Sequence, residues 1–240
     1  MRRPAPLLAC LLIACAWPGA GQAHVPSPAA PAEQAEGASR FAAAVPMQGT
    51  AAVQESYGPF LVVDERTVAL DGATDADSPA AFAALLRDHP AIAELSFHDC
   101  PGTYDDIANL ALGRMIRDQG LITVAPEGGS VRSGAVELFL AGRRRIIADG
   151  AEFAVHTWLD EDGLEAADFG ADSPQNRKYL AYYRDMGMTA EEAVRFYALT
   201  NSAPYDDALW LTGPEMREVL GPAEAELPQL ADLDLAALVD

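Results

Sequence analysis

The sequence predicts an α/β fold with a largely parallel sheet. Short apolar runs rich in Val, Ile and Phe alternate with longer stretches whose apolar residues recur at helical spacing. A chain of alternating strands and helices buries its strands in a parallel sheet that helices cover. The chain has only 3 cysteines among 240 residues, which excludes a small scaffold held together by disulfides.

The first expected elements lie between residues 59 and 97. Two strands are expected at 59–64 (PFLVVD) and 67–70. The Ser-Pro pair at 78–79 is typical of a helix start, so a helix is expected over 80–88. A buried strand is expected at 92–97.

An amphipathic helix is expected over 105–118. One of its faces would consist of Ile107, Leu110, Ala111, Met115 and Ile116. Gly120 suits the end of this helix, because glycine adopts the left-handed conformation found there. The next strand is expected at 121–125.

The second half of the chain begins with a helix at 134–142 and strands at 144–148 and 152–158. Residues 160–172 carry six acidic side chains and predict a surface loop. Thr189 and Glu192 fit a capping box at the start of a late helix. The last expected elements are helices near 175–186 and 189–200, a strand at 209–211 and a helix at 214–220.

The N-terminal residues 1–23 resemble a secretory signal peptide. A basic start precedes a short apolar run and a small-x-small site, so cleavage is expected after Ala23. A lipobox-like segment leaves lipidation at Cys15 open as an alternative. The remaining chain is expected to divide into a flexible Ala/Pro-rich linker at 24–55, one domain at 56–222 and an acidic tail at 223–240. An exported, periplasmic protein is therefore expected, with a lipoprotein as the alternative.

Net charge restricts the partners. The chain carries 36 acidic and 16 basic side chains, a net charge of −20. Nucleic acid and anionic lipid surfaces would repel it, so neither is an expected partner. The sequence has no P-loop, no dinucleotide fingerprint, no HExxH and no paired CxxC, so no cofactor and no metal are expected.

One group of residues, in the order in which they follow one another, predicts a catalytic site. Pro101 and Gly102 follow a strand, a helix and a strand come next, and Ser133 then leads directly into a helix through Gly134. His156 follows on a later strand. A serine at a helix start has backbone N–H groups beside it that can hold an oxyanion, and a nearby histidine can take its proton.

This order and spacing resemble the Clp protease/crotonase superfamily, specifically its serine-peptidase branch. The resemblance covers about residues 60–220. It is clearest in CPGTYDDIANLALGRMIRDQGLITVAPEGGSVRSGAVELFLAG and RRRIIADGAEFAVHTW. The segments NRKYLAYYRDMGM and DDALWLTGPEM look like those of exported, Clp-like bacterial relatives. The resemblance implies a spiral of ββα units with C-terminal helices.

The resemblance also implies site residues. Ser133 would be the nucleophile and His156 the base, with Gly102, Thr103 and Gly134 forming the oxyanion hole. The chain departs from the family where Thr103 replaces a glycine, because a β-branched residue resists conformations that glycine adopts. Asp207 is the preferred third member, while Asp206 and Asp185 stay open.

Other residues near the expected site have less claim to a catalytic role. Taken alone, Ser133 fits a helix N-cap. His98 at a strand end is a rival catalytic group but is expected to line the loop or bond to backbone. Cys100 lies in the same loop rather than at a helix start, and it would be the only cysteine of the mature chain. An unpaired thiol of this kind is expected to be buried or half-buried.

These observations favour an exported serine hydrolase, a peptidase, that acts through an acyl-enzyme intermediate on a peptide or a small ester or amide. The alternative is a catalytically inactive envelope binding or scaffolding protein on the same fold. An acyl-CoA enzyme fits poorly, because the negative charge would repel the phosphates of CoA. A homo-oligomer is expected by resemblance alone.

Overall fold

The computed structural model describes residues 55–221. The expected signal peptide at 1–23, the alternative lipid anchor at Cys15 and the acidic tail at 223–240 lie outside the described residues. So does the linker expected at 24–55, apart from its last residue, Glu55, which belongs to a strand. No helix within 55–221 is long and apolar enough to cross a membrane.

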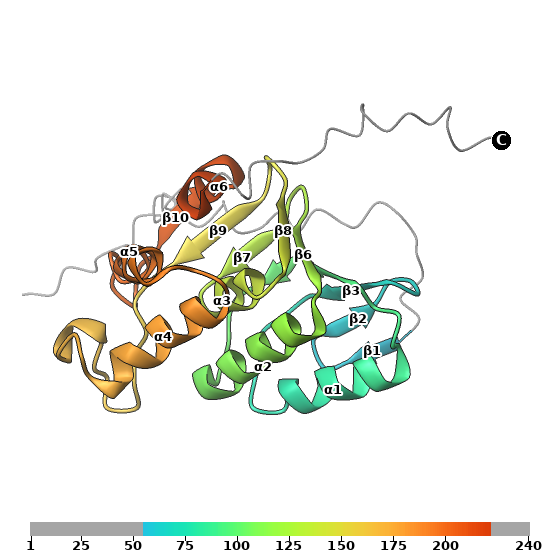
Figure 1. Cartoon of the computed structure of the whole chain (residues 1–240), viewed down its shortest axis with the longest axis horizontal. Helices are drawn as coiled ribbons and strands as arrows, with labels where there is room; N and C mark the ends of the chain where they lie inside the picture. Colours follow the sequence, from blue (N-terminus) through green and yellow to red (C-terminus); the bar gives the residue numbers. More distant parts are fainter. Residues whose placement is uncertain (1–54, 222–240) are drawn as a thin grey trace, which may run out of the picture. The chain divides into compact units, whose positions relative to one another are not determined.

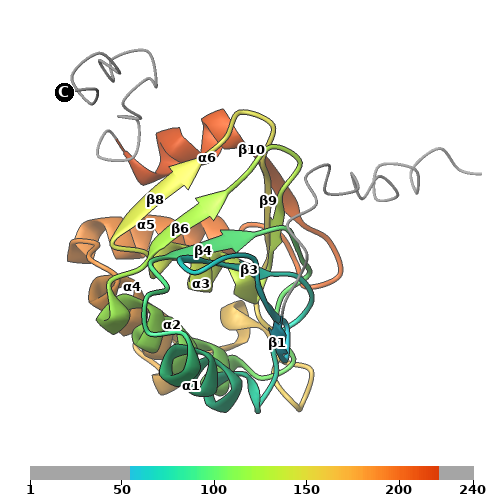
Figure 2. The same ribbon diagram turned by 90° about the vertical axis from the view of Figure 1, so that its right-hand side faces the viewer.

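The larger sheet has six strands in the order β1-β2-β3-β4-β6-β8. The first two pairings are antiparallel, and β3, β4, β6 and β8 run parallel to one another (Figure 2). The strands are β1 (Glu55–Tyr57), β2 (Phe60–Val62), β3 (Thr67–Leu70), β4 (Glu94–Phe97), β6 (Ile122–Ala125) and β8 (Arg144–Ile147).

The smaller sheet has the order β10-β9-β7-β5, with only the β9–β10 pair antiparallel. Its strands are β5 (Asp99–Cys100), β7 (Ser130–Arg132), β9 (Glu152–Val155) and β10 (Leu209–Thr212). From β4 to β9 successive strands alternate between the two sheets, so the pairs β4/β5, β6/β7 and β8/β9 each contribute one strand to either sheet. The first two pairs are followed by a helix, and this confirms the predicted ββα units with largely parallel sheets.

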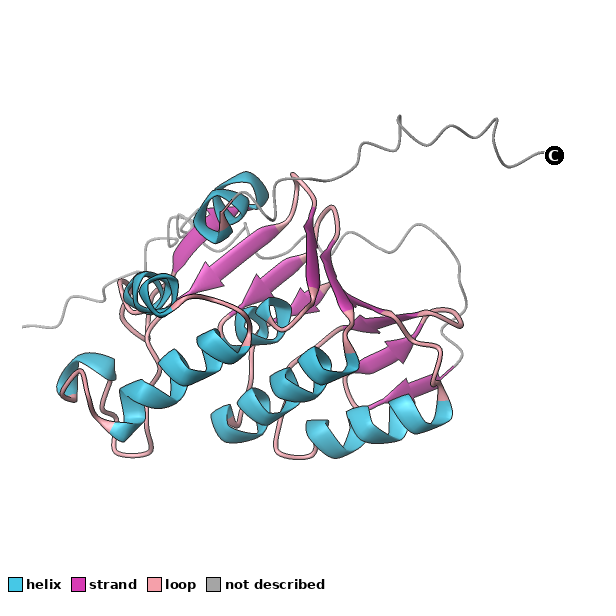
Figure 3. Cartoon of the chain, viewed as in Figure 1, coloured by secondary structure: helices cyan, strands magenta, loops and turns pink. Residues whose placement is uncertain are grey.

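The helices match the predicted ones closely. They are α1 (Ser78–Asp88), α2 (Asp106–Gln119), α3 (Gly134–Leu140), α4 (Pro174–Asp185), α5 (Ala190–Thr200) and α6 (Gly213–Leu220), with a short 3-10 turn at η2 (Ala166–Asp168). Figures 1 and 3 show α1 and α2 side by side, both on the same side of the larger sheet. Thr189 and Glu192 form the predicted capping box of α5.

One part of the prediction for α2 is wrong. Ile107 and Ala111 were expected on the apolar face of the helix, but both are exposed, Ile107 by 77%. The buried positions of α2 are instead Asn109, Leu110, Leu112, Gly113 and Ile116. The helix is therefore rotated so that Ile107 faces outward near the start of α2.

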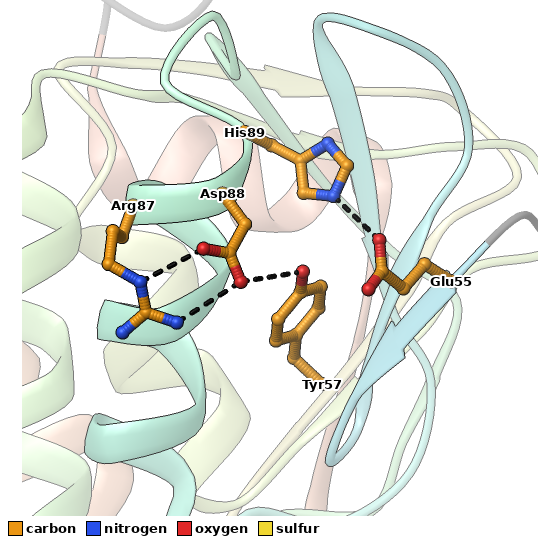
Figure 4. A network of polar contacts seen from close by, with 5 residues as sticks. All are labelled: Glu55, Tyr57, Arg87, Asp88 and His89. Atoms are coloured by element: carbon orange, nitrogen blue, oxygen red, sulfur yellow. Dashed lines mark hydrogen bonds and ion pairs between the residues drawn. The ribbon is translucent and has the colours of Figure 1, made fainter.

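A polar network joins β1 to the end of α1 (Figure 4). The Tyr57 hydroxyl donates to Asp88 Oδ2 at 3.1 Å, and Asp88 accepts two hydrogen bonds from the Arg87 guanidinium. His89 Nε2 lies 3.0 Å from Glu55 Oε2. Burial and the neighbouring carboxylates raise the pKa of Tyr57 to about 12. These contacts hold the edge strand of the larger sheet against the helix.

Candidate active site

Ser133 lies at the sharp turn between β7 and α3. Its φ of 49° makes it the one non-glycine residue with positive φ within 55–221. A non-glycine residue held there costs about 1–3 kcal/mol, so the surrounding structure must impose the conformation. A strand-to-helix turn of the same kind exposes the nucleophile in α/β-hydrolases.

The hydroxyl of Ser133 does not cap the helix that follows it. No hydrogen bond joins its side chain to the N–H groups of the first turn of α3. Serine at a helix start normally makes that bond, as the side chains of Asp105, Ser173 and Thr189 do at α2, α4 and α5. The Ser133 hydroxyl therefore has no structural role in the helix and faces the cavity beside it.

Gly102 lies directly against Ser133. Its φ is 126°, and a Cβ built on it would lie 2.8 Å from Ser133 Cβ and 3.2 Å from Ser133 Oγ. Real Cβ atoms do not approach other atoms so closely, so any other residue here would displace the serine. The predicted juxtaposition of the Gly102 loop with Ser133 is therefore present in the structure.

The backbone N–H groups of Thr103 and Gly134 have no acceptor among residues 55–221. The two residues are in contact, since a Cβ on Gly134 would lie 2.6 Å from Thr103 Cγ2. The Thr103 hydroxyl donates toward the backbone oxygens of Thr74 and Asp105 and accepts from the Asp105 N–H. These bonds hold the β-branched side chain of Thr103 against the backbone of Thr74 and Asp105, so a threonine is accommodated where a glycine was expected.

His156 follows β9 and is oriented by a backbone carbonyl. Its Nδ1 lies 2.7 Å from the Thr157 oxygen. A carbonyl only accepts, so in the neutral imidazole Nδ1 carries the proton and Nε2 carries the lone pair. The ring also packs edge-on against Tyr205, with 5.3 Å between ring centroids.

Thr157 is itself fixed from several sides. The residue is buried, and its N–H donates to the Ala203 oxygen at 3.0 Å. Its hydroxyl donates to Asn201 Oδ1 at 2.7 Å, and Asn201 Nδ2 donates to the Tyr197 oxygen at 2.6 Å. A chain of hydrogen bonds thus runs from the end of α5 to the imidazole of His156.

A cavity of about 750 Å³ brings Ser133 and His156 together in one lining. Neither Ser133 Oγ nor His156 Nε2 has a hydrogen-bond partner among residues 55–221, and no bond joins the two side chains. Catalytic hydrogen bonds are often loose without substrate and tighten in the complex. The cavity walls also contain Pro101, Thr103, Tyr104, Asp105, Asp106, Ile107, Asn109, Leu110, Gly134, Glu137, Val155, Thr157, Trp158, Leu159, Asp160, Glu161, Lys178, Tyr179, Tyr183, Tyr197, Thr200, Asn201 and Tyr205.

None of the three candidate aspartates forms a hydrogen bond or an ion pair with His156. The carboxylate of Asp207 accepts the N–H of Ala208 and is exposed, as is Asp206. Asp185 pairs with Arg114 Nε at 3.0 Å on the far end of α4. The Thr157 carbonyl occupies the place beside Nδ1 that the sequence-based prediction reserved for a carboxylate.

His98 and Cys100 also lie outside the cavity lining. His98 Nε2 contacts Ser96 Oγ at 3.2 Å, and burial lowers the pKa of His98. The Cys100 thiol donates to the Leu70 oxygen and is fully buried, as predicted, and this burial raises its pKa. A buried thiol of raised pKa is a poor nucleophile.

Two of the carboxyl groups that line the cavity, those of Asp106 and Glu137, accept from tyrosines and are called the cavity floor here; the sequence-based prediction did not single them out. Asp106 Oδ2 accepts from the Tyr179 hydroxyl at 2.6 Å, and Glu137 Oε1 accepts from the Tyr183 hydroxyl at 2.8 Å. Burial raises the pKa of Glu137 to about 7, and the nearby Asp106 adds to the effect. The position of Glu137, four residues after Ser133 on one helix face, is the signal that could have identified it. Within 55–221, no three His, Cys, Asp or Glu side chains cluster as a metal site.

Solved structures similar to this chain include those of a stomatin-specific protease and of ClpP1. A mutant of the 1510-N membrane-bound stomatin-specific protease has 16% identity and a TM-score of 0.43, over 64% of this chain and 74% of that one. Another mutant of that protease, in complex with a substrate peptide, has 16% identity and a TM-score of 0.40, over 64% and 73%. A mutant of ClpP1 from Listeria monocytogenes has 17% identity and a TM-score of 0.43, over 65% and 88%.

Comparisons of the sequence itself found no counterpart. No protein-family model matches the chain, and no curated protein matches it. The structural neighbours share so little identity that they assign no activity to this chain.

Proposed function

We propose that the chain is a serine hydrolase, specifically a peptidase, in which Ser133 is the nucleophile and His156 the general base. The observation that carries the proposal is the strained backbone of Ser133, with a hydroxyl that does not cap its helix and lines a cavity shared with His156. Strain of this kind concentrates at active sites.

The proposed reaction forms an acyl-enzyme. Ser133 Oγ attacks the carbonyl carbon of the substrate while His156 Nε2 takes the hydroxyl proton. The N–H groups of Thr103 and Gly134 stabilise the oxyanion that forms on the carbonyl oxygen. The C–N bond then breaks, and His156 returns the proton to the leaving amine. Water, activated by His156 in turn, releases the acid and restores the serine.

The Thr157 carbonyl has a defined part in this proposal. It holds the tautomer in which Nε2 is the acceptor, which a base beside Ser133 requires. A neutral carbonyl stabilises an imidazolium less than a carboxylate does, so a modest hydrolytic rate is expected. Export and assembly into a homo-oligomer stay predictions from the sequence.

Labelling with a fluorophosphonate probe tests the proposal. The wild-type protein should be labelled at Ser133, as located by peptide mass spectrometry, and Ser133→Ala should lose the label. His156→Ala should label at least about 100-fold more slowly, because it loses its general base. An unlabelled wild type, with circular dichroism confirming a folded protein, would favour the alternative of a binding or scaffolding protein.

A further inference from the structure

The two carboxyl groups on the cavity floor have no cationic partner. Asp106 and Glu137 each accept from a single tyrosine hydroxyl, and neither forms an ion pair with any Lys, Arg or His of residues 55–221. Partly buried carboxylates normally gain a counter-charge, because desolvation otherwise disfavours the charged form. Glu137 lies one turn of α3 from Ser133, so this negative floor adjoins the proposed nucleophile.

The cavity mouth bears large apolar side chains that face solvent. Tyr104 is 86% exposed and Ile107 is 77% exposed, and both line the cavity beside the Gly102 loop. Leu159 and Tyr205, on the opposite elements of the lining, are also exposed. A group of exposed apolar side chains around a cavity is typical of a surface that contacts another molecule.

The cavity walls already hold one cation. Lys178, the only lysine of the chain, places its Nζ 4.9 Å from the ring centroid of Tyr179 and 5.5 Å from that of Trp158. Aromatic faces attract cations through their quadrupoles. Lys178 forms no ion pair with a described carboxylate, so the rings are its principal partners. The same walls can stabilise an ammonium or guanidinium that enters from outside.

We propose that the substrate is a polypeptide segment that places a lysine or arginine side chain on the floor formed by Asp106 and Glu137, with apolar neighbours against Tyr104 and Ile107. This inference rests on the proposed function, because it concerns the specificity of that same site. A cavity of about 750 Å³ exceeds the size of one side chain, which favours a peptide over a small amine.

The charge of the floor depends on pH. Burial holds the pKa of Glu137 near 7, while Asp106 raises it and the Tyr183 hydrogen bond lowers it. Tyr182 also contacts Glu137, through its hydroxyl to the Glu137 backbone oxygen. Glu137 therefore gains its negative charge as pH rises through about 7, and a preference for basic side chains should increase over the same range.

Peptidyl diphenyl phosphonates test the inference, because they label a serine nucleophile and carry a chosen side chain beside the phosphorus. Probes with lysine and with norleucine in that position have stems of the same length and differ in the terminal ammonium. The lysine probe should label Ser133 at least about tenfold faster. The ratio of the two rates cancels every pH effect that the two probes share, so its rise between pH 6 and 8 reports Glu137.

Two variants assign the preference to the floor. Asp106→Asn and Glu137→Gln should each reduce the lysine-to-norleucine ratio at least threefold. Asp118→Asn is a matched control, because it removes the same charge from the exposed far end of α2 and should leave the ratio unchanged. Ile107→Ser should slow both probes equally, since it weakens contact with the apolar residues of the probe and leaves the contact of its lysine or norleucine with the floor unchanged.

The outcomes separate this inference from the proposed function. If fluorophosphonate labels Ser133 but the lysine and norleucine probes react equally, the inference is wrong and the serine hydrolase stands. A lysine preference that persists in both floor variants would also overturn it. Should Glu137→Gln fail to fold, the lysine-to-norleucine ratios of the wild type and of Asp106→Asn still test the inference. A chain that no serine-directed probe labels contradicts the proposed function itself.

Discussion

Two polar networks in this molecule both join carboxyl groups to tyrosine hydroxyls, but they differ in how the negative charge is compensated. In the network at the β1–α1 edge, each carboxylate faces a basic side chain: Asp88 pairs with Arg87, and Glu55 lies beside His89 (Figure 4). On the cavity floor, Asp106 and Glu137 face only tyrosine hydroxyls.

The difference shows what each network is suited to do. Water solvates the edge network, so its charges are satisfied whether or not the pairs form, and the pairs contribute little to stability. The cavity floor has less access to water, so its negative charges stay costly until something positive approaches. An uncompensated pair of carboxyl groups next to a strained serine is better suited to recognition than to stability.

The largest expected effect in the cavity region comes from Gly102→Ala. The added Cβ would meet Ser133 Cβ at 2.8 Å, and alanine also resists the φ of 126°, so the serine must move. A displacement near 1 Å costs about 100-fold in reactivity. The rate of fluorophosphonate labelling measures this loss of reactivity. Gly170→Ala is the control, because nothing lies within 4 Å of its Cβ position, and equal losses in both variants would contradict the assignment.

Glu137→Gln is expected to stabilise the protein above pH 7. The folded state holds the Glu137 proton up to about pH 7, whereas the unfolded chain releases it near 4.5. The unfolding free energy of the wild type therefore falls as pH rises between those values, by about 1–3 kcal/mol. Glutamine does not titrate and still accepts from Tyr183. Urea unfolding at pH 4 and pH 8 should show a difference between the two proteins only at pH 8.

Asn201→Ala and Thr157→Val are expected to slow labelling of Ser133 about tenfold, because each removes the hydrogen bond between Asn201 and the Thr157 hydroxyl, which helps to fix the residue whose carbonyl contacts His156. The double variant should be no slower than either single one, since both act through one hydrogen bond. Thr157→Ser, which keeps the hydroxyl, should restore the rate, an outcome that a merely structural role would not give. In the Asp207→Asn variant, the probe should label Ser133 at the wild-type rate. A slower rate would show that Asp207 acts together with Ser133 and His156.

The smallest effect is expected at the edge network. Asp88→Asn removes one partner of Arg87 and weakens the bond from Tyr57, but all three side chains remain solvated. The midpoint of urea unfolding should barely move, and the labelling rate should stay unchanged. A large loss of stability would show that the two networks are more alike than their exposure indicates.

Local pattern was sufficient to predict most of the helices and strands. The apolar spacing of 105–118 predicted α2, and the capping box predicted the start of α5, because these signals act over a few residues. Order, spacing and the family resemblance singled out five residues: Thr103, Ser133, Gly134 and His156, which share one cavity lining, and Gly102, which lies against Ser133.

Other features depended on contacts between distant segments. The two-residue strand β5 exists only because β7 pairs with it, and no local pattern marks so short a strand. Ile107 has helical spacing that suits a core position, but the packing of α2 against α1 and α3 turns it outward. Sequence spacing alone does not fix how a helix is rotated against its neighbours.

The partner of His156 is the clearest case. The sequence position relative to the following strand favoured Asp207 over Asp206. In the structure the Asp207 carboxylate is exposed, and the Thr157 carbonyl lies beside His156 Nδ1. Every residue has a backbone carbonyl, so no pattern of side chains can identify the carbonyl that contacts the histidine. Residue types and their order thus predicted that Ser133 and His156 lie in one cavity lining, whereas only the hydrogen bonds of Thr157 with Asn201 and Ala203 decided which group lies beside His156 Nδ1.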